Sequence, residues 1–140
     1  MNPFVRCVIP ADEDPIDEPS WEQVEAAIRK MTGEEEVFSV LLFRVALSES
    51  SPETAGFQSE PWLAVHGEPG HYLVEFHETN SYNVVNPLFE DSDKEIEINA
   101  CGIFDFFPRK TLVELEVALR AAKMFYEQGV KDSSLKWIIF

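Results

Sequence analysis

Apolar residues recur at helical spacing in two segments of the chain, one near each end. The first stripe consists of Trp21, Val24, Ile28 and Met31. The second stripe consists of Leu115, Ala118, Leu119, Ala122 and Phe125. Because residues three and four positions apart lie on one face of a helix, each stripe predicts an amphipathic helix with this face toward the core.

Capping patterns predict where the two helices begin and end. At each N-terminus a Ser or Thr is followed three residues later by Gln or Glu, which is the capping-box pattern. These pairs are Ser20 with Gln23 and Thr111 with Glu114. Thr32-Gly33 and Gly129 follow the two stripes, and glycine readily adopts the left-handed conformation that ends a helix.

Elsewhere the apolar residues follow the patterns of strands. Alternating or continuous apolar runs predict strands over residues 4–9, 37–47, 62–66, 71–78, 82–85, 95–99, 103–107 and 136–140. Residues 37–47 are almost wholly apolar, which is typical of a central strand covered on both faces. Gly67-Glu68-Pro69-Gly70 predicts a hairpin turn, whereas Ala100-Cys101-Gly102 predicts a break with a bulge at Gly102.

The order of these elements predicts the fold class. Residues 71–78 read as a half-buried strand, with Tyr72, Val74 and Phe76 on one face and Leu73, Glu75 and His77 on the other. Residues 10–19 contain three prolines and five acidic residues and predict a solvated loop. We expect one α+β domain over residues 1–140, a mostly antiparallel sheet of about six strands with two helices packed on one face.

Composition restricts the possible functions. Hydrophobic residues make up 45% and aromatic residues 12% of the 140, which suits a folded core and excludes an unfolded polyanion. The 26 acidic and 11 basic residues give a net charge of −15. This charge argues against nucleic-acid binding and against docking on an anionic membrane. No apolar run reaches the length of a membrane span and no signal segment is recognisable, so we expect a cytoplasmic protein.

The acidic residues are unevenly distributed along the chain. Residues 1–104 contain 21 acidic and 5 basic residues, whereas residues 105–140 contain 5 acidic and 6 basic residues. Clusters lie at Asp12-Glu13-Asp14 with Asp17-Glu18, at Glu34-Glu35-Glu36, and at Glu90-Asp91 with Asp93. Solubility explains each cluster taken alone. Together they favour a basic protein partner, because such a surface accelerates encounter with positive charge.

Signals for catalysis or metal binding are weak. His66, His71, Glu75 and His77 lie on or beside one predicted hairpin, but their spacing matches no standard zinc site. Asp105, among apolar neighbours, is either a buried carboxylate or, as we favour, an outward residue of an edge strand. The sequence lacks nucleophile and phosphate-loop motifs, so we expect no enzyme, no cofactor and no metal.

The two cysteines offer little chemistry at the level of sequence. Cys7 and Cys101 are separated by most of the chain and form no CxxC pattern. In a reducing cytoplasm such thiols usually act as small hydrophobic residues. We therefore expect both to be buried thiols outside any disulfide.

The C-terminal part of the sequence carries the most specific pattern. An alanine-rich helix contains Ala121-Ala122-Lys123-Met124-Phe125-Tyr126, and Gly129 and Leu135-Lys136-Trp137 follow it. This stretch resembles the immunity proteins of bacterial polymorphic toxin systems, which are paired with deaminase and nuclease toxins. Looser matches extend the resemblance over most of residues 20–140, namely Ser20-Trp21, the hairpin over residues 62–78, and Gly102 before an Ile-Phe strand.

The resemblance implies a function without catalysis. Such a protein binds a cognate toxin domain in the cytoplasm of the producing cell and blocks its active site or substrate groove. The net charge agrees, because a toxin that acts on nucleic acid needs a basic cleft. We expect the contacts on an outer strand face and the acidic loop after it, namely Glu75, His77, Glu78, Tyr82, Glu90, Asp91 and Asp93.

Several alternatives remain open at this stage. Tyr82 is either an interface anchor or an edge-strand tyrosine packed on the sheet. The whole protein is either the immunity protein described above or an acidic interaction or scaffold module with no toxin. A third hypothesis is a small metal-dependent enzyme that uses His66, His71 and His77.

Overall fold

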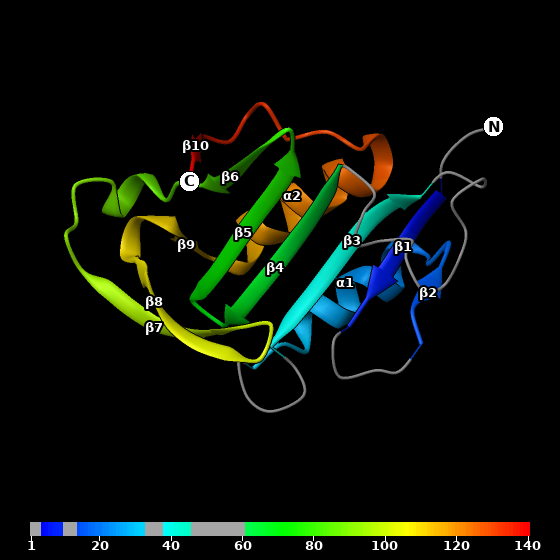
Figure 1. The fold of residues 1–140 in the computed structure, drawn as a ribbon, viewed down its shortest axis with the longest axis horizontal. Helices are drawn as coiled ribbons and strands as arrows, with labels where there is room; N and C mark the ends of the chain where they lie inside the picture. The colour runs from blue at the N-terminus through cyan, green and yellow to red at the C-terminus, as the bar shows by residue number, and fades with distance from the viewer. Residues whose placement is uncertain (1–3, 10–13, 33–37, 46–60) are drawn as a thin grey trace.

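An antiparallel sheet with two helices on one face forms the body of the protein (Figure 1). The computed structural model describes residues 4–9, 14–32, 38–45 and 61–140. The helices are α1 (Trp21–Arg29) and α2 (Leu115–Gln128). The strands of the main sheet are β1 (Phe4–Val8), β2 (Ile16–Asp17), β3 (Ser39–Val45), β4 (Trp62–Glu68), β5 (His71–Glu78), β6 (Asn80–Val84), β9 (Leu112–Val113) and β10 (Trp137–Ile139). A separate hairpin consists of β7 (Glu95–Ala100) and β8 (Ile103–Pro108), and the short 3-10 helices are η2 (Pro87–Phe89) and η3 (Arg109–Thr111).

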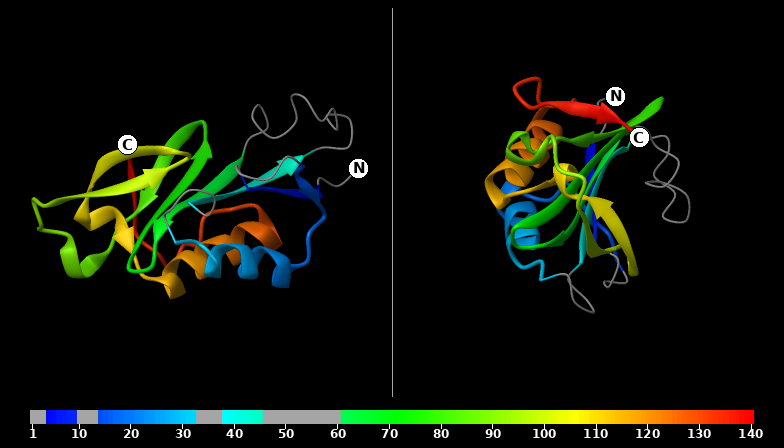
Figure 2. Two further views of the ribbon diagram at one scale, coloured as in Figure 1. Left: turned by 90° about the horizontal axis from the view of Figure 1, so that it is seen from below. Right: turned by 90° about the vertical axis from the view of Figure 1, so that its left-hand side faces the viewer.

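The predicted α+β class is confirmed, but the predicted number of about six strands is wrong. Among the described residues, the main sheet has eight strands in the order β10-β6-β5-β4-β3-β1-β2, with β9 beside β5, and every pair is antiparallel. Strands β2 and β9 are two residues long, so apolar alternation could not predict them. Figure 2 shows α1 and α2 side by side against the same face of the sheet. Within the described ranges, no helix has the length and apolar character needed to cross a bilayer.

The start of α1 is as predicted, and its end is not. The Ser20 hydroxyl accepts from the backbone N–H of Gln23 at 3.1 Å, and the Gln23 side chain accepts from the backbone N–H of Ser20 at 2.9 Å. The helix ends at Arg29 with Lys30 as its cap, before the predicted Thr32-Gly33. Gly33 lies outside the described residues. The chain leaves the helix early because Met31 donates its N–H to the nearer carbonyl of Ile28, which tightens the last turn.

The start of α2 was predicted wrongly. No capping box forms between Thr111 and Glu114, because Thr111 lies in η3 and donates its hydroxyl to the carbonyl of Pro108 at 2.7 Å. Residues 112–113 then pair with β5 as β9, so α2 begins only after Glu114. Its end is as predicted, since Gly129 has a φ of 71° and donates its N–H to the carbonyl of Phe125 at 2.8 Å.

Two tight turns connect the hairpins. Strand β4 runs two residues further than predicted, to Glu68, whereas β5 has the predicted bounds, so only Pro69-Gly70 lie between them. The predicted break at residues 100–102 is a turn rather than a bulge, because Cys101 (φ 53°) and Gly102 (φ 89°) join β7 to β8. Positive φ at both central residues is the backbone of a type I′ hairpin turn. This turn places the Cys101 side chain at the tip of the hairpin.

The main core lies between the sheet and the helices. Val24 and Ile28 of α1 and Phe125 of α2 are fully buried against Tyr72 and Phe76 of β5. On the opposite face of the sheet, a second cluster contains Leu41, Phe43 and Ala64, with Val8 and Trp62 packed against it. A third cluster joins Leu73, Ile98 and Leu112 where the β7–β8 hairpin covers the end of β5. Strand β5 is therefore buried on both faces at this end, rather than half-buried as predicted.

Part of the predicted loop over residues 10–19 belongs to the sheet. Ile16–Asp17 form β2, which pairs with β1, and Nη2 of the buried Arg6 lies 3.1 Å from an Asp17 carboxylate oxygen. Residues 10–13 lie outside the described residues. The polar composition of this segment predicted a loop, but its Asp17 lies in a strand and forms an ion pair with the buried guanidinium of Arg6.

Candidate functional site

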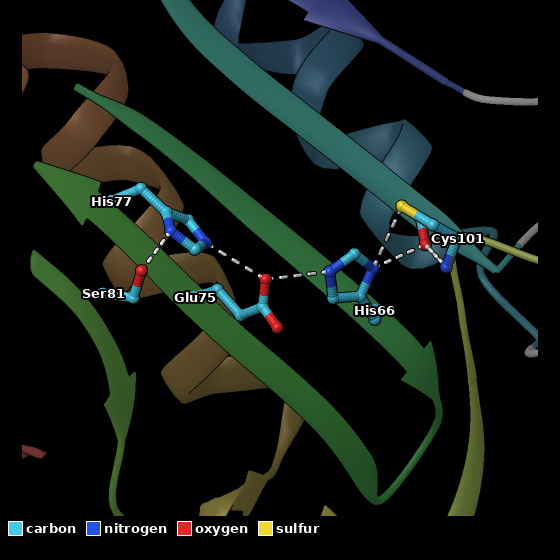
Figure 3. A network of polar contacts seen from close by, with 6 residues as sticks. His66, Glu75, His77, Ser81 and Cys101 are labelled. Carbon is cyan, nitrogen blue, oxygen red and sulfur yellow. Dashed lines mark hydrogen bonds and ion pairs between the residues drawn. The ribbon is translucent and has the colours of Figure 1, made fainter. Parts of the chain in front are cut away.

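A row of polar side chains crosses the face of the sheet opposite the helices. It consists of Ser39 on β3, His66 on β4, Glu75 and His77 on β5, Ser81 on β6 and Cys101 in the β7–β8 turn, and we call it the polar network. Figure 3 shows His66, Glu75, His77 and Ser81 on neighbouring strands, with Cys101 beside His66. The register pairs Ser39 with His66 and His77 with Ser81, and paired residues share one face of a sheet.

The Glu75 carboxylate joins the two histidines. Its Oε2 atom lies 3.4 Å from Nε2 of His66 and 3.2 Å from Nε2 of His77. The other ring nitrogens contact hydroxyls, with His77 Nδ1 2.7 Å from the Ser81 oxygen and His66 Nδ1 2.6 Å from the Ser39 oxygen. The Cys101 sulfur lies 3.9 Å from Nδ1 of His66. The network is thus a continuous chain of polar contacts across four strands and a turn.

Mutual contacts, acting against burial, make His66 and Glu75 an ion pair at neutral pH. The His66 side chain is 4% exposed and that of Glu75 16%. Burial alone would lower the pKa of His66, but its contacts with Cys101 and Glu75 outweigh this effect and raise it to about 9. Burial alone would raise the pKa of Glu75, but hydrogen bonds and charges from His66 and His77 lower it to about 2. His66 is therefore an imidazolium held against a carboxylate.

Aromatic rings fix the His77 end of the network. Trp62 stacks on the His77 ring with centroids 3.7 Å apart and planes inclined by 13°. Phe140 meets the same ring edge-on at 5.8 Å, while remaining 56% exposed. The imidazole is thus held between two aromatic side chains, and its nitrogens stay directed at Glu75 and Ser81.

Cys101 is exposed, so the prediction that both thiols are buried is wrong for this residue. Cys7 is buried in the main core, as predicted. The difference arises because Cys101 occupies the tip of a tight turn rather than a strand. The hydrogen bond with His66 lowers the pKa of the Cys101 thiol, and the His66 charge and the Ser39 hydroxyl add to this effect against partial burial.

The histidines do not assemble as the metal hypothesis requires. His66 and His77 both contact Glu75, whereas His71 lies near the hairpin turn with its Nδ1 3.8 Å from Glu68. In the part of the chain that the structure describes, no group of three or more His, Cys, Asp or Glu residues is arranged to hold a metal ion. The hydrogen-bonding of the network itself accounts for the two inner histidines.

The predicted contact residues lie at three separate places. Glu75 and His77 belong to the polar network, and Glu78 is exposed at the end of β5. Tyr82 packs against the main core on the opposite face, 6.3 Å from the Phe76 ring, with the Lys131 ammonium 3.6 Å above its own ring. This placement agrees with the alternative that Tyr82 packs on the sheet.

The acidic loop lies apart from these residues, beside the β7–β8 hairpin. Asp91 and Asp93 are exposed between η2 and β7, and Glu90 forms an ion pair with Lys136. In Figure 1 this loop leads directly into β7 at the side of the molecule away from β1.

The strand predicted over residues 103–107 forms as β8 next to this loop, but the exposure of its apolar side chains was not predicted. On β8, Ile103 is 69%, Phe104 62% and Phe106 58% exposed. Asp105 between them is exposed, as we favoured. Its carboxylate accepts a hydrogen bond from the backbone N–H of Phe106. The Ile-Phe-Asp-Phe-Phe run was a usable signal, but a run of large apolar residues in a strand usually indicates burial.

Comparison with known proteins agrees with the resemblance seen in the sequence. The family model described as immunity protein Imm1 matches residues 12–138. The matched range begins before β2 and ends within β10, so it includes both helices and all the residues of the polar network. No curated protein matches the chain.

Proposed function

Because the chain belongs to the Imm1 family of immunity proteins, we propose that it binds a cognate bacterial toxin domain in the cytoplasm and neutralises it without catalysis. The toxin in this proposal has a basic, nucleic-acid-binding cleft, which the protein occludes. A net charge of −15 supports this choice of partner, since phosphate backbones and acidic proteins compete for the same cationic surface.

The surface proposed for docking is an acidic arm, defined as residues 90–107. It carries six acidic residues and one basic residue, Lys94. The single observation that carries the proposal is the exposure of Ile103, Phe104 and Phe106 on β8 in the middle of these charges. Phe104 and Phe106 share one face of β8, because residues two apart in a strand point the same way, whereas Ile103 lies on the other face. Large apolar side chains that remain exposed together are typical of a binding surface, and aromatic residues dominate interface energies.

The edge position of β8 provides a second kind of contact. In the described part of the chain β8 pairs only with β7, so the backbone of its other edge is open to a further strand. Glu97 lies opposite Phe106 in the register, which puts a carboxylate beside an apolar anchor. A second copy of this chain paired at this edge would bring carboxylates of the two copies together, and these would repel each other. We therefore propose a basic partner rather than self-association.

The contacts predicted from the sequence stay proposals. Asp91 and Asp93 belong to the acidic arm and fit the proposed surface directly, and Glu90, also in the arm, is exposed while paired with Lys136. Glu78 is also exposed. Glu75, His77 and Tyr82 are largely occupied by contacts within the protein, so we expect them to contribute less to binding.

The geometry of the β7–β8 turn supports a role without catalysis. Cys101, His66 and Glu75 stand in the order of a nucleophile, a base and a carboxylate. Acyl transfer also needs N–H donors for the developing oxyanion. Both turn amides are already used, because Cys101 donates its N–H to Ser39 at 3.0 Å and Gly102 donates its N–H to Asn99 at 2.8 Å.

A binding measurement with matched variants tests this proposal. The probe is the C-terminal domain of the protein encoded directly before this gene, where the proposal expects a large secreted toxin. We expect the double variant Phe104→Ser/Phe106→Ser to weaken binding at least about 100-fold, because each aromatic anchor contributes about 2 kcal/mol. Val130→Ser, which removes another exposed apolar side chain outside the arm, should bind like the wild type.

The charges of the arm are tested in the same assay. Glu95→Lys/Glu97→Lys should slow association about tenfold or more, because it reverses two exposed charges beside the anchors. Glu116→Lys/Glu127→Lys makes the same change in total charge on α2 and should have a smaller effect. Equal effects of the two variants would contradict the arm as the docking surface, and no binding by the wild type would favour a scaffold module without this toxin.

A further inference from the structure

We propose that Cys101 is a reactive thiol site that forms mixed disulfides with low-molecular-weight disulfides. The site consists of an exposed sulfur, the buried His66 ring beside it, and Glu75 behind that ring. The proposal is independent of toxin binding, because it concerns the chemistry of the polar network alone. Four observations support it.

The first observation is that His66 cannot turn away from the sulfur. Its side chain is 4% exposed, and both ring nitrogens are held, Nδ1 by Ser39 at 2.6 Å and Nε2 by Glu75 at 3.4 Å. An imidazolium in this position presents an N–H to the region that contains the Cys101 sulfur, 3.9 Å away. A thiolate next to such a fixed positive charge is stabilised over the thiol.

The second observation is that the backbone fixes the cysteine. Cys101 has a φ of 53°, which a residue with a side chain rarely adopts, and its N–H is bound to the Ser39 oxygen. Ser39 therefore holds both the turn and the histidine. The Ser39 hydroxyl thus holds the Cys101 backbone and the His66 ring next to each other.

The third observation concerns the charges that face the sulfur. His66 on β4 favours the thiolate, the Ser39 hydroxyl on β3 also favours it, and Glu75 on β5 opposes it. The Glu75 carboxylate lies on the far side of the His66 ring, which is between it and the sulfur. The net result is a pKa of the Cys101 thiol below its ordinary value.

The fourth observation is accessibility. Cys101 is exposed, whereas the other cysteine, Cys7, is 1% exposed in the main core. A small disulfide can therefore approach one sulfur and not the other. This contrast provides an internal control within the same chain.

The proposed step is thiol–disulfide exchange. The Cys101 thiolate attacks one sulfur of a disulfide RSSR, a new S–S bond forms, and the original S–S bond breaks. The electron pair leaves with the second sulfur as RS⁻, which takes a proton from water. The disulfide itself is the oxidant, and the modification of each Cys101 thiolate consumes one disulfide molecule.

The experiment follows the reaction of the full-length native protein with dithiobis(nitrobenzoate), whose released thiolate is coloured. We expect one fast equivalent in the native state and a second only after denaturation. The fast rate should stay high at a pH where an ordinary thiol, with a pKa of 9.0, is almost wholly protonated. Mass spectrometry after exposure to glutathione disulfide should place the adduct on Cys101.

Matched variants separate this site from a merely exposed thiol. His66→Gln should slow the fast phase at neutral pH about tenfold or more and move its pH midpoint upward, because the adjacent positive charge is lost. His71→Gln, on the same hairpin but outside the network, should react like the wild type. If His66→Gln fails to fold, the ultraviolet absorbance of the thiolate, measured as wild type minus Cys101→Ser against pH, gives the same midpoint. A midpoint near 9.0 in the wild type, or a rate unaffected by His66→Gln, would overturn the proposal.

Discussion

At the scale of single residues, the buried pair of His66 and Glu75 is the feature with the clearest energetic consequence. The pair crosses the sheet between β4 and β5, and each partner alone would be an uncompensated buried charge. Removing one partner of such a pair lowers the free energy of unfolding by more than the intact pair contributes to it, because the remaining charged group is left buried without a partner. The stability of this protein should therefore depend on pH through these two groups.

The direction of this dependence follows from the two pKa shifts. The pKa of His66 is raised from 6.5 to about 9, so its contribution is complete below pH 6.5 and is lost as the pH rises through about 9. The pKa of Glu75 is lowered from 4.5 to about 2, so its contribution is complete above pH 4.5 and is lost toward pH 2. Both contributions are therefore complete between pH 4.5 and 6.5.

We expect Glu75→Gln to lower the free energy of unfolding by about 3 kcal/mol in that window and by progressively less on either side. Urea denaturation at a series of pH values measures this difference. Glu78→Gln, an exposed neighbour on the same strand, should change stability by less than about 0.5 kcal/mol at every pH. A Glu75→Gln effect that does not vary with pH would contradict the buried ion pair.

A second residue-scale prediction concerns two glycines of the β4–β5 hairpin. Gly67 has a φ of 106°, and a Cβ atom there would lie 2.3 Å from the carbonyl oxygen of His71. Gly70 has a φ of 84°, but a Cβ atom would meet nothing within 4 Å. We expect Gly67→Ala to destabilise the protein by about 2 kcal/mol more than Gly70→Ala, because only Gly67→Ala adds a backbone clash to the strain of positive φ. Thermal or urea unfolding checks the difference, and equal effects would contradict this register.

At the scale of elements, what the sequence could predict depended on whether the determining contacts were local. The capping box at Ser20 and the glycine cap at Gly129 involve residues within one turn, and both were predicted correctly. The start of α2 was not, because Leu112 and Val113 pair with β5, some forty residues earlier in the chain. The capping-box pattern at Thr111 is present in the sequence, but the pairing of Leu112 and Val113 with β5 prevents the helix from starting there.

The candidate site shows the same division. The sequence placed Glu75 and His77 on one face of one strand, because alternation within a strand is local. It did not bring Ser39 or Cys101 to them, since these residues come from β3 and from the β7–β8 turn. It favoured an edge strand at Asp105, but it could not show that Phe104 and Phe106 stay exposed, because that depends on what packs against the β7–β8 hairpin.

A prediction at this scale uses the uncapped N-terminus of α2. Glu114 occupies the N-cap position but makes no side-chain capping hydrogen bond. We expect Glu114→Ser to raise the free energy of unfolding by about 0.5–1 kcal/mol, since serine caps helices well. Ser20→Ala, which removes an existing cap from α1, should lower it by about 1 kcal/mol. Urea denaturation measures both, and a destabilising Glu114→Ser would mean that Glu114 has a role other than that of a poor cap.

At the scale of the whole molecule, charge and exposed apolar surface act at different stages of the proposed binding. The acidic residues act over distance and set the rate of encounter, whereas Phe104 and Phe106 act only on contact and set the lifetime of the complex. The net charge of −15 also repels other copies of the chain, which helps to keep the exposed β8 edge from self-association. The acidic arm combines both properties in one continuous segment.

This division predicts how the proposed complex responds to salt. The association rate constant should fall about tenfold or more between low ionic strength and about 0.5 M salt, because screening weakens long-range attraction. The dissociation rate constant should change much less, because it depends on the buried apolar contacts. Stopped-flow or surface-based kinetics with the cognate toxin domain measures both, and an association rate insensitive to salt would contradict electrostatic steering.

The central claim is tested most directly by rescue of bacterial growth. The toxin domain encoded before this gene is expressed alone, with the wild-type chain, with Phe104→Ser/Phe106→Ser, and with the control Val130→Ser. We predict that the wild type and Val130→Ser restore growth, and that the double variant, although folded, does not. A toxin domain that kills in the presence of the wild-type chain would contradict immunity, and full rescue by the double variant would contradict docking through the acidic arm.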